Sequence, residues 1–236
     1  AFSDLPDYLC LAFVYDTLPY KIGRGKFQEL VKKAGSIVEF AAADRNDLVD
    51  WIRRRFKALG KDIDDRDAEY LIFLCGDLMT GLRGEIEKIG SYAKGSAVAR
   101  ADIDAVADPV LDAEVFDMTD AVGGRDFKRA MVILSDLFSL REKPIMVLAA
   151  LGKNLRQLYT ARLALESGKG APALMEMWNM KTSWQANKLM QSARRCPLDW
   201  CRRAVALAGE ADLAMKSTGR DQEDVLTELM LRLANG

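Results

Sequence analysis

The stretch PIMVLAALGKNLRQLYTARLALES, from Pro144 to Ser167, is the longest uninterrupted helical pattern in the chain. Its apolar residues recur at steps of three and four, which places them in one stripe along an α-helix. Pro144 suits the first helical position, and Gly168 suits the stop. The pattern predicts a core helix around which the second half of the chain packs. The residues of the stripe are Ile145, Leu148, Leu151, Leu155, Leu158, Tyr159 and Leu165.

The two halves of this helix differ in polarity. Residues 145–151 are apolar on every side, so we expect other helices to cover that end. A helix that is enclosed at one end and solvated at the other is typical of a helical bundle. The polar face that we expect in the second half consists of Lys153, Asn154, Arg156, Gln157 and Arg162.

The composition of the chain excludes several classes of function. Its 236 residues, half of them hydrophobic, suffice for one large domain or two small ones. Lys and Arg total 34 against 35 Asp and Glu, so a net charge of −1 gives no overall reason to expect nucleic acid or an anionic membrane as the main partner. Histidine is absent, which excludes serine–histidine and cysteine–histidine catalysis and every histidine metal site.

The cysteines and the apolar segments predict a cytoplasmic protein. Cys10, Cys75, Cys196 and Cys201 show no C-x-x-C spacing and mostly fall on apolar positions, as small core residues do in a reducing compartment. No membrane-spanning window and no secretory leader is recognisable. The chain begins Ala-Phe-Ser without a Met, so we expect a fragment.

The first 43 residues read as a strand–helix–strand unit. Residues Tyr8 to Tyr15, YLCLAFVY, form an apolar run typical of a strand buried on both faces. A short helix is expected from Lys26 to Ala34, and a second strand from Ile37 to Phe40. Such a unit cannot cover its own sheet. We therefore expect residues 1–43 to be the end of a truncated α/β domain.

Residues 44–112 are expected to form a small, lid-like helical subdomain. Asp44 caps the first helix, and Gly60 stops it. Four basic residues crowd its polar side. They would suit a nucleic-acid patch, but the solvated face of a helix is the more common explanation. These basic residues are Arg53, Arg54, Arg55 and Lys57. The helices expected after this one are Asp67 to Cys75, Leu82 to Lys94 and Asp102 to Ala107.

From Asp112 onward the whole chain has a helical pattern. Short breaks with Gly or Pro separate the helices, so that neighbouring helices must fold back on one another as a bundle of about seven. No repeat that would indicate a solenoid is visible. The expected helices are Ala113 to Val122, Asp126 to Ser139, Pro144 to Ser167, Ala171 to Trp178, Ser183 to Arg194, Leu198 to Ser217 and Asp221 to Ala234.

No catalytic, metal or cofactor site is predicted. Gly90 to Ser96, GSYAKGS, lacks the lysine of a phosphate loop and follows a helix, where the motif needs a strand. Acidic pairs such as Asp64 and Asp65 occur outside any recognisable metal-loop context. Asp212 and Lys216 lie one turn apart, as a surface ion pair would.

Several segments resemble a known family in the same order along the chain. EADLAMKSTGRDQEDVLTELMLRL, from Glu210 to Leu233, is similar to the end of the delta subunits of bacterial DNA polymerase III, which belong to the sliding-clamp loader. LCGDLMTGLRGEIEKIGSYA, from Leu74 to Ala93, resembles the lid of clamp-loader and AAA+ proteins. The resemblance covers residues 44–236. It also includes VFDMTDAVGGRDFKRAMVIL from Val115 to Leu134, the helix from Lys143, and the segment that ends WQANKLMQSARR.

The resemblance implies a mainly α protein with three parts. Residues 1–43 would be the remnant of an AAA+-like α/β domain, 44–112 the helical lid, and 113–236 a helical collar. The protein would be a non-catalytic subunit of the DNA polymerase III holoenzyme, whose complex is a DNA-directed DNA polymerase. Its collar would join the other loader subunits in a pentameric ring that loads the sliding clamp in DNA replication. The missing N-terminal part would contact the clamp, and primer–template DNA would be contacted only in the assembled complex. No membrane would be contacted.

Two details fit a subunit that does not hydrolyse ATP. Active relatives place a nucleotide-sensing arginine three residues after the glycine of the lid turn, and counting from Gly76 leads here to Met79. Arg194-Arg195-Cys196 superficially resembles an arginine finger, but it falls between collar helices. The alternatives are a free-standing helical adaptor unrelated to replication and, least favoured, an enzyme with an unrecognised site. A complete α/β domain encoded upstream of residue 1 would distinguish the loader subunit from the adaptor.

Overall fold

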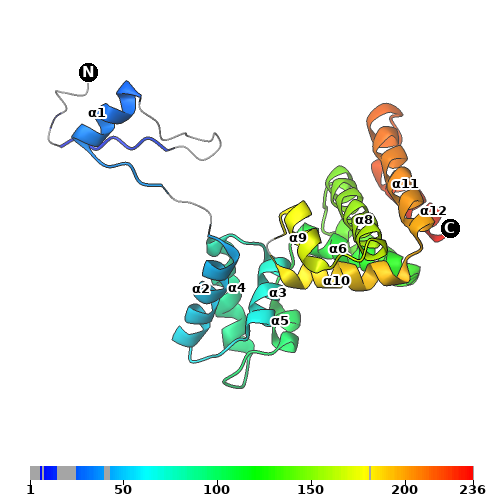
Figure 1. The fold of residues 1–236 in the computed structure, drawn as a ribbon, viewed down its shortest axis with the longest axis horizontal. Helices are drawn as coiled ribbons and strands as arrows, with labels where there is room; N and C mark the ends of the chain where they lie inside the picture. Colours follow the sequence, from blue (N-terminus) through cyan, green and yellow to red (C-terminus); the bar gives the residue numbers. More distant parts are fainter. Residues whose placement is uncertain (1–5, 7, 15–24, 40–42, 181, 236) are drawn as a thin grey trace. The chain divides into compact units, whose positions relative to one another are not determined.

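The computed structural model describes residues 6, 8–14, 25–39, 43–180 and 182–235. Contacts divide the chain into two units, residues 1–43 and residues 44–236. The described residues form twelve α-helices and no strand, so the prediction of a mainly α fold is confirmed (Figure 1). The division of residues 44–236 into a lid and a collar stays a prediction, because contacts join them in one unit.

The described residues of the first unit include one helix, α1 (Lys26–Ala34), as predicted. The two predicted strands are wrong for the residues described there, because 8–14 and 36–39 form no strand; Tyr15 and Phe40 lie outside the described residues. A strand needs a neighbour to complete its hydrogen bonds, and the described part of this unit supplies none. The side chains of the apolar run are largely exposed, with Tyr8 at 91%.

The helices of residues 44–112 begin at acidic caps where the sequence offers them. In the second unit, Asp44 accepts a hydrogen bond from the Asp47 N–H at 2.9 Å, and Asp64 accepts one from the Asp67 N–H at 2.7 Å. Fully buried aliphatic and aromatic side chains, among them Phe56, hold these helices together. The helices are α2 (Arg45–Ala58), α3 (Asp65–Cys75), α4 (Met79–Tyr92) and α5 (Arg100–Val106).

The loop after α4 is fastened to the end of α2. Lys61 donates from Nζ to the carbonyl oxygens of Ala93 at 2.5 Å and Gly95 at 2.6 Å. Gly90 lies so close to α2 that a Cβ atom there would approach Leu59 Cδ1 to 2.7 Å. The glycine-rich segment 90–96 is therefore the end of a helix and a packed loop, as predicted.

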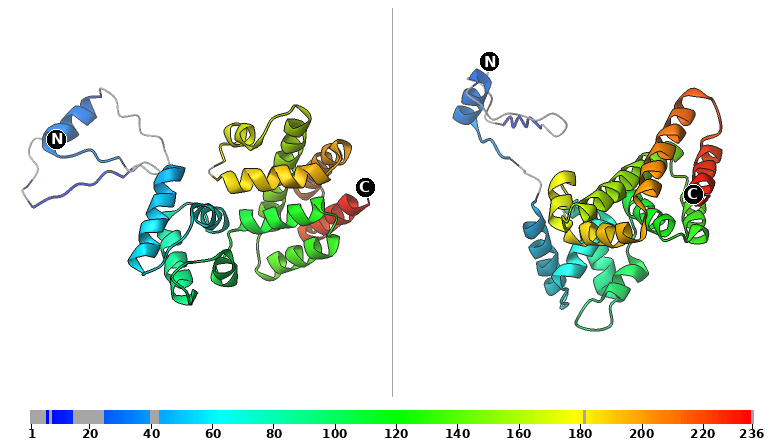
Figure 2. Two further views of the ribbon diagram at one scale, coloured as in Figure 1. Left: turned by 60° about the horizontal axis from the view of Figure 1, so that its bottom comes forward. Right: turned by 45° about the vertical axis from the view of Figure 1, so that its right-hand side comes forward.

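The remaining helices form a bundle around α8. Helix α8 packs against α6, α10 and α11, and α11 and α12 pack against each other near the C-terminus (Figures 1 and 2). The predicted bundle of seven helices is confirmed within the described residues. Its members are α6 (Leu111–Gly123), α7 (Phe127–Ser139), α8 (Pro144–Glu166), α9 (Ala171–Trp178), α10 (Ser183–Arg195), α11 (Leu198–Ser217) and α12 (Gln222–Ala234).

Helix α8 is more enclosed than its sequence predicts. Leu151, Leu155 and Leu158 are buried, which confirms the apolar stripe. The expected polar face is partly wrong, because Asn154 and Gln157 are only 3% and 2% exposed. Neighbouring helices cover the second half of α8 as well as the first, so these two amides lie inside the protein.

Candidate interaction surfaces

Among the described residues, no group of three or more Cys, Asp or Glu side chains is placed to hold a metal ion. Within the same residues, no helix is both long enough and apolar enough to cross a membrane.

The buried carboxylate of Glu69 joins the helices of residues 44–112 to the bundle around α8. Oε2 of Glu69 on α3 accepts hydrogen bonds from the Ser183 N–H at 2.9 Å, from the Ser183 hydroxyl at 2.7 Å and from the Trp184 N–H at 3.2 Å. These donors form the N-terminus of α10, where a negative charge is favoured. The other oxygen of Glu69 forms an ion pair with Arg45 of α2. One side chain thus connects three helices.

An aromatic cluster lies beside this carboxylate. The ring of Trp184 lies 4.6 Å from that of Phe73 and 4.9 Å from that of Tyr70, centroid to centroid. The guanidinium of Arg100 stacks 3.6 Å above the Tyr70 ring, and the Tyr70 hydroxyl donates to Asp104 at 2.7 Å. Burial, followed by this hydrogen bond, raises the pKa of Tyr70 well above its ordinary value. The cluster adds ring–ring and cation–π contacts between α3, α5 and α10.

A second carboxylate, that of the half-buried Asp120 of α6, is held by three side chains of α10. Lys188 and Arg195 approach it at 3.0 and 2.6 Å, and the Ser192 hydroxyl donates to it. Burial acts to raise the pKa of Asp120, but the hydrogen bonds and the two cations outweigh burial and lower it below its ordinary value. Arg195 is thereby paired within the chain although half of its side chain is exposed, and the neighbouring Cys196 is buried.

The basic side of α2 is partly engaged in contacts within the chain. Arg53 lies 3.3 Å from Asp65, and Arg55 stacks 5.3 Å above the Trp51 ring. Surface pairs of this kind are typical of a solvated helix face. The geometry adds no support for a nucleic-acid patch.

Met79 is the first residue of α4 and is 39% exposed. It follows the turn at Gly76, whose φ of +83° only glycine adopts readily. The resemblance places a nucleotide-sensing arginine at this position in active relatives. A thioether has no donor with which to pair with phosphate.

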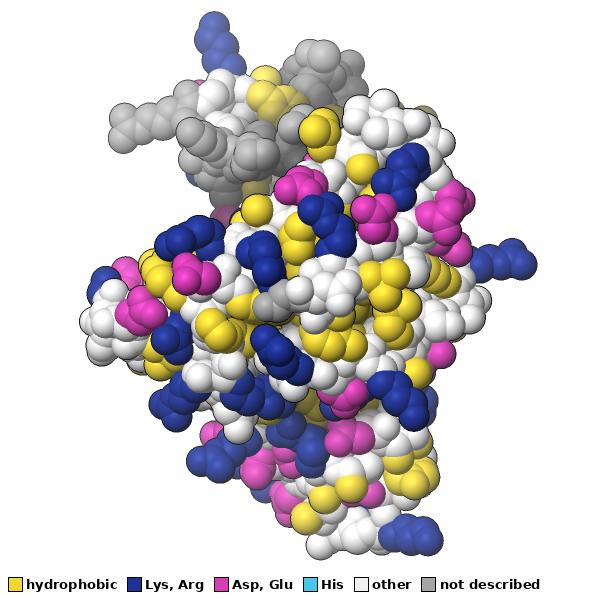
Figure 3. Space-filling model, turned by 90° about the vertical axis from the view of Figure 1, so that its right-hand side faces the viewer, with side chains coloured by type: hydrophobic (Ala, Val, Ile, Leu, Met, Phe, Trp, Pro, Cys, Tyr) yellow, Lys and Arg dark blue, Asp and Glu magenta, His cyan; other side chains and the backbone are white. Residues whose placement is uncertain are grey.

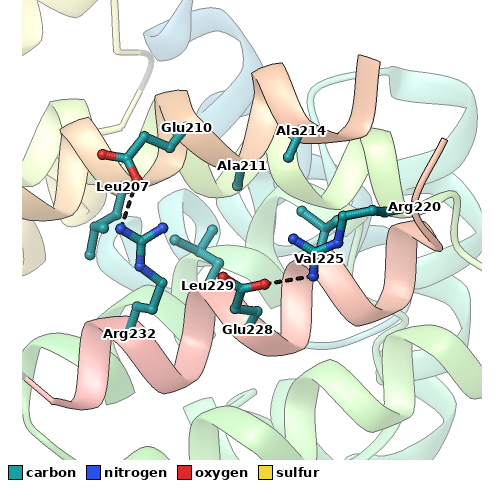
Figure 4. A pocket seen from close by; sticks show the side chains of 9 residues that line it. All are labelled: Leu207, Glu210, Ala211, Ala214, Arg220, Val225, Glu228, Leu229 and Arg232. Carbon is teal, nitrogen blue, oxygen red and sulfur yellow. Dashed lines mark hydrogen bonds and ion pairs between the residues drawn. The ribbon is translucent and has the colours of Figure 1, made fainter. Parts of the chain in front are cut away.

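A shallow groove runs between α11 and α12 (Figure 4). Two ion pairs border it: Arg232 with Glu210 and Arg220 with Glu228, at 2.7 and 2.6 Å. Its floor is apolar and includes the small side chains of Ala211 and Ala214. On the same helices, Leu213 and Leu231 are exposed. Leu213 and Leu231 do not line the groove; the groove with its two ion pairs is called the outer groove of the bundle.

Charges are interspersed over the face of the molecule that Figure 3 shows. Hydrophobic side chains gather in its middle, with Lys, Arg, Asp and Glu scattered around and between them. The predicted pair of Asp212 and Lys216 is confirmed as a surface ion pair at 2.7 Å. This mixture suits contacts with proteins better than contacts with a polyanion.

Glu69, Asp120 and Gln157 are hard to recognise from the sequence. Glu69 lies one turn before Ile72 and next to Ala68, both buried, so an acidic residue within an apolar stripe was the available signal. The half-buried Asp120 follows the buried Thr119. Their partners lie on helices far along the chain, so spacing could not reveal them.

The fold and these surfaces define a helical-bundle protein with surfaces suited to protein contacts. A family model described as "DNA polymerase III delta subunit, C-terminal domain" matches residues 112–233. Since this is more than half of the chain, the protein belongs to the family of DNA polymerase III delta subunits.

Two curated relatives agree with this family. The probable DNA polymerase III subunit delta of Aquifex aeolicus is 26% identical over 156 residues, which are 65% of this chain and 45% of that protein. The DNA polymerase III subunit delta of Bacillus subtilis is 22% identical over 210 residues, 88% of this chain and 60% of that protein. The chain thus spans about half the length of the curated relatives it matches.

A solved structure has a similar fold. The Bacillus subtilis DNA clamp loader delta protein matches with a TM-score of 0.65 at 20% sequence identity. The match covers 90% of this chain and 63% of that chain.

Proposed function

We propose that this chain acts as a non-catalytic subunit of a bacterial clamp loader, which places a sliding clamp on DNA during replication. The observation that carries the proposal is the match of the delta-subunit family model to residues 112–233, the helical bundle built around α8. The family and the relatives' names support the role, and the absence of a recognisable catalytic arrangement among the described residues is compatible with it.

The bundle of residues 113–236 is the proposed collar, through which the chain meets the other loader subunits. Residues 44–112 are the proposed lid, and residues 1–43 belong to the proposed AAA+-like part. Contact with the clamp is assigned to parts of the relatives that this chain does not match, and contact with primer–template DNA to the assembled complex. The proposed location is the cytoplasm.

We assign the outer groove and the exposed leucines of its two helices to a neighbouring subunit. Leu213 of α11 and Leu231 of α12 are 66% and 56% exposed, and large apolar side chains typically anchor an interface. The flanking ion pairs would form its polar rim.

Gel filtration of the chain with the other loader subunits of its source organism tests the proposal. We expect co-elution with at least one subunit, and loss of co-elution for Leu213→Asp. Leu78→Asp, which alters a comparably exposed residue before α4, is the matched control and should co-elute as the parent does. Failure of the folded parent chain to bind any loader subunit would contradict the role, whereas equal binding by Leu213→Asp would contradict only the assignment of this α11–α12 surface.

A further inference from the structure

Two buried thiols lie at the corner where α10 ends and α11 begins. Cys196 and Cys201 are 2% and 1% exposed, and both are free thiols in the structure. Four residues separate them in the chain, a spacing that matches no recognised redox motif. The sequence alone therefore does not mark them as a pair.

The geometry at the start of α11 brings the two side chains together. Pro197 is the N-cap of α11, so Cys196 precedes the cap and Cys201 is the fourth helical residue. Side chains at these two positions pack against each other in the hydrophobic staple, which fixes the direction in which a chain enters a helix. The Cys201 N–H donates to the Pro197 carbonyl oxygen at 3.1 Å and closes this first turn. The two sulfur atoms are thus neighbours, as a disulfide requires.

The Cys196 thiol lies against the end of α6 and close to the surface of the corner. It donates to the Gly123 carbonyl oxygen at 3.5 Å, and a Cβ at Gly123 would approach its sulfur atom to 3.1 Å. On either side of it along the chain, Arg195 and Pro197 are exposed. Movement of this corner alone would therefore bring the thiol to solvent, where a small oxidant could reach it.

The two thiols differ in acid strength. A hydrogen bond from the Cys201 thiol lowers the pKa of Cys196, and this effect outweighs its burial. The guanidinium groups of Arg195 and Arg162 also lower that pKa, whereas Asp120 raises it. The same hydrogen bond and burial raise the pKa of Cys201. Because the thiolate is the nucleophile, Cys196 is the thiol suited to attack, and Cys201 is the thiol suited to close the bond.

We propose that Cys196 and Cys201 form a reversible disulfide when the chain meets a peroxide. The Cys196 thiolate attacks one oxygen of hydrogen peroxide, the O–O bond breaks, and hydroxide leaves with the proton that Cys196 gave up, so that a sulfenic acid and water form. The Cys201 sulfur then attacks the sulfenic sulfur, the S–O bond breaks, and hydroxide leaves with the Cys201 proton as a second water. One peroxide is reduced, and two thiols are oxidised to one disulfide.

The disulfide would fix the angle at which the chain passes from α10 to α11. Both helices pack against α8, so oxidation at this corner acts on the centre of the bundle. The proposal does not depend on the function proposed above.

Mass spectrometry of the folded chain after treatment with hydrogen peroxide tests the pair. Trypsin cleaves after Arg195 and Arg202, so both cysteines fall in one peptide, 196–202. We expect this peptide to be lighter by two hydrogen atoms, to resist alkylation, and to regain both hydrogen atoms with dithiothreitol. Circular dichroism should show that the oxidised chain keeps its helices. A peptide that stays reduced, or that gains oxygen without losing two hydrogen atoms, would overturn the pairing.

Single variants separate the roles of the two thiols. Cys201→Ser removes the second thiol, so the sulfenic acid of Cys196 should persist and be trapped by dimedone. Cys196→Ser should give no dimedone adduct at Cys201, because burial keeps that thiol protonated. Cys75→Ser, on α3, is the matched control and should form the disulfide as the parent does. The reverse pattern of adducts would overturn the assignment of the attacking thiol.

A redox titration distinguishes a pair built by the fold from two cysteines that are merely near in sequence. In glutathione buffers, the ratio of disulfide to dithiol gives the effective concentration of the two thiols. It should be at least about tenfold higher in the folded chain than in urea, because folding holds the sulfur atoms together. By linkage, the oxidised chain should unfold at a higher urea concentration than the reduced chain. An effective concentration no higher in the folded chain would overturn the proposal.

Discussion

Replacing Glu69 by alanine removes the carboxylate that joins α3 to α10. Its Oε2 atom accepts three hydrogen bonds, at 2.7, 2.9 and 3.2 Å, and its second oxygen pairs with Arg45. The replacement leaves the first N–H groups of α10 without this acceptor. It also leaves Arg45 without its partner.

The expected loss follows from these contacts. A hydrogen bond to an ionised group contributes about 1.5–3 kcal/mol net. All three donors share one oxygen, and Ser183 and Trp184 are partly exposed, so water replaces part of what they lose. The Arg45 side chain is 37% exposed and stays solvated, so its share is small. We therefore expect Glu69→Ala to lower the free energy of unfolding by about 2–4 kcal/mol, and Tm by about 4–16 °C for a chain of this size. Glu69→Gln, which keeps one acceptor oxygen, should lose about half as much.

Urea unfolding followed by circular dichroism measures this loss, with the m-value as a check on cooperativity. Glu87→Ala is the matched control, because Glu87 is exposed and pairs only with Arg83 one turn away at 2.9 Å. It should change stability by less than about 0.5 kcal/mol. A double-mutant cycle of Glu69→Ala with Ser183→Ala should give a coupling energy of about 1 kcal/mol or more. A loss at Glu69 no larger than that at Glu87 would refute the role of this carboxylate.

Three further predictions concern the core and the titrating groups. Leu155→Ala, at a buried position of α8, should cost about 2–5 kcal/mol in the same urea assay, and a Tm within a degree of the parent would show that α8 is not central. Burial, followed by the nearby Glu85, raises the pKa of Cys75 to about 12, so its thiol stays protonated near pH 8. Alkylation by iodoacetamide should therefore be slow at Cys75, accelerate about tenfold per pH unit up to that pKa, and be faster at the exposed Cys10. The pKa of Asp120 is lowered in the folded protein. The ionised carboxylate therefore stabilises the fold above the pKa of the unfolded state, near pH 4, and this stabilisation is lost as the pH falls through the pKa of the folded state. Asp120→Asn should flatten that part of the pH–stability curve.

Helix positions were predictable from the sequence where periodicity and caps agree. The helices Ala171–Trp178 and Leu198–Ser217 have the predicted ends, whereas Asp221, predicted as the first residue of the last helix, is the N-cap of α12. Helix α4 begins three residues before the predicted Leu82, because its N-cap, Leu78, has no side-chain acceptor that would mark the start. Local signals thus determined the helices to within a turn.

The candidate sites were much less predictable, because long-range packing creates them. Asn154 and Gln157 look like surface residues in the sequence, and only the helices packed around α8 bury them. The apolar run at residues 8–14 has the composition of a buried strand, yet strand formation depends on a neighbour that composition cannot supply. Burial and pairing depend on which helices meet, and the local pattern does not contain that information.

Glu69 and its donor Ser183 are 114 residues apart in the chain, and this distance has a consequence during synthesis. A bacterial ribosome adds about 5–20 residues per second, so α3 emerges roughly 6–23 seconds before the start of α10. Throughout that interval the carboxylate lacks the N–H groups that stabilise it in the finished protein, and Tyr70 and Phe73 lack the ring of Trp184. The short loops of the bundle let its own helices pair soon after each is made. Residues 44–112 therefore complete their folding only after α10 has left the ribosome.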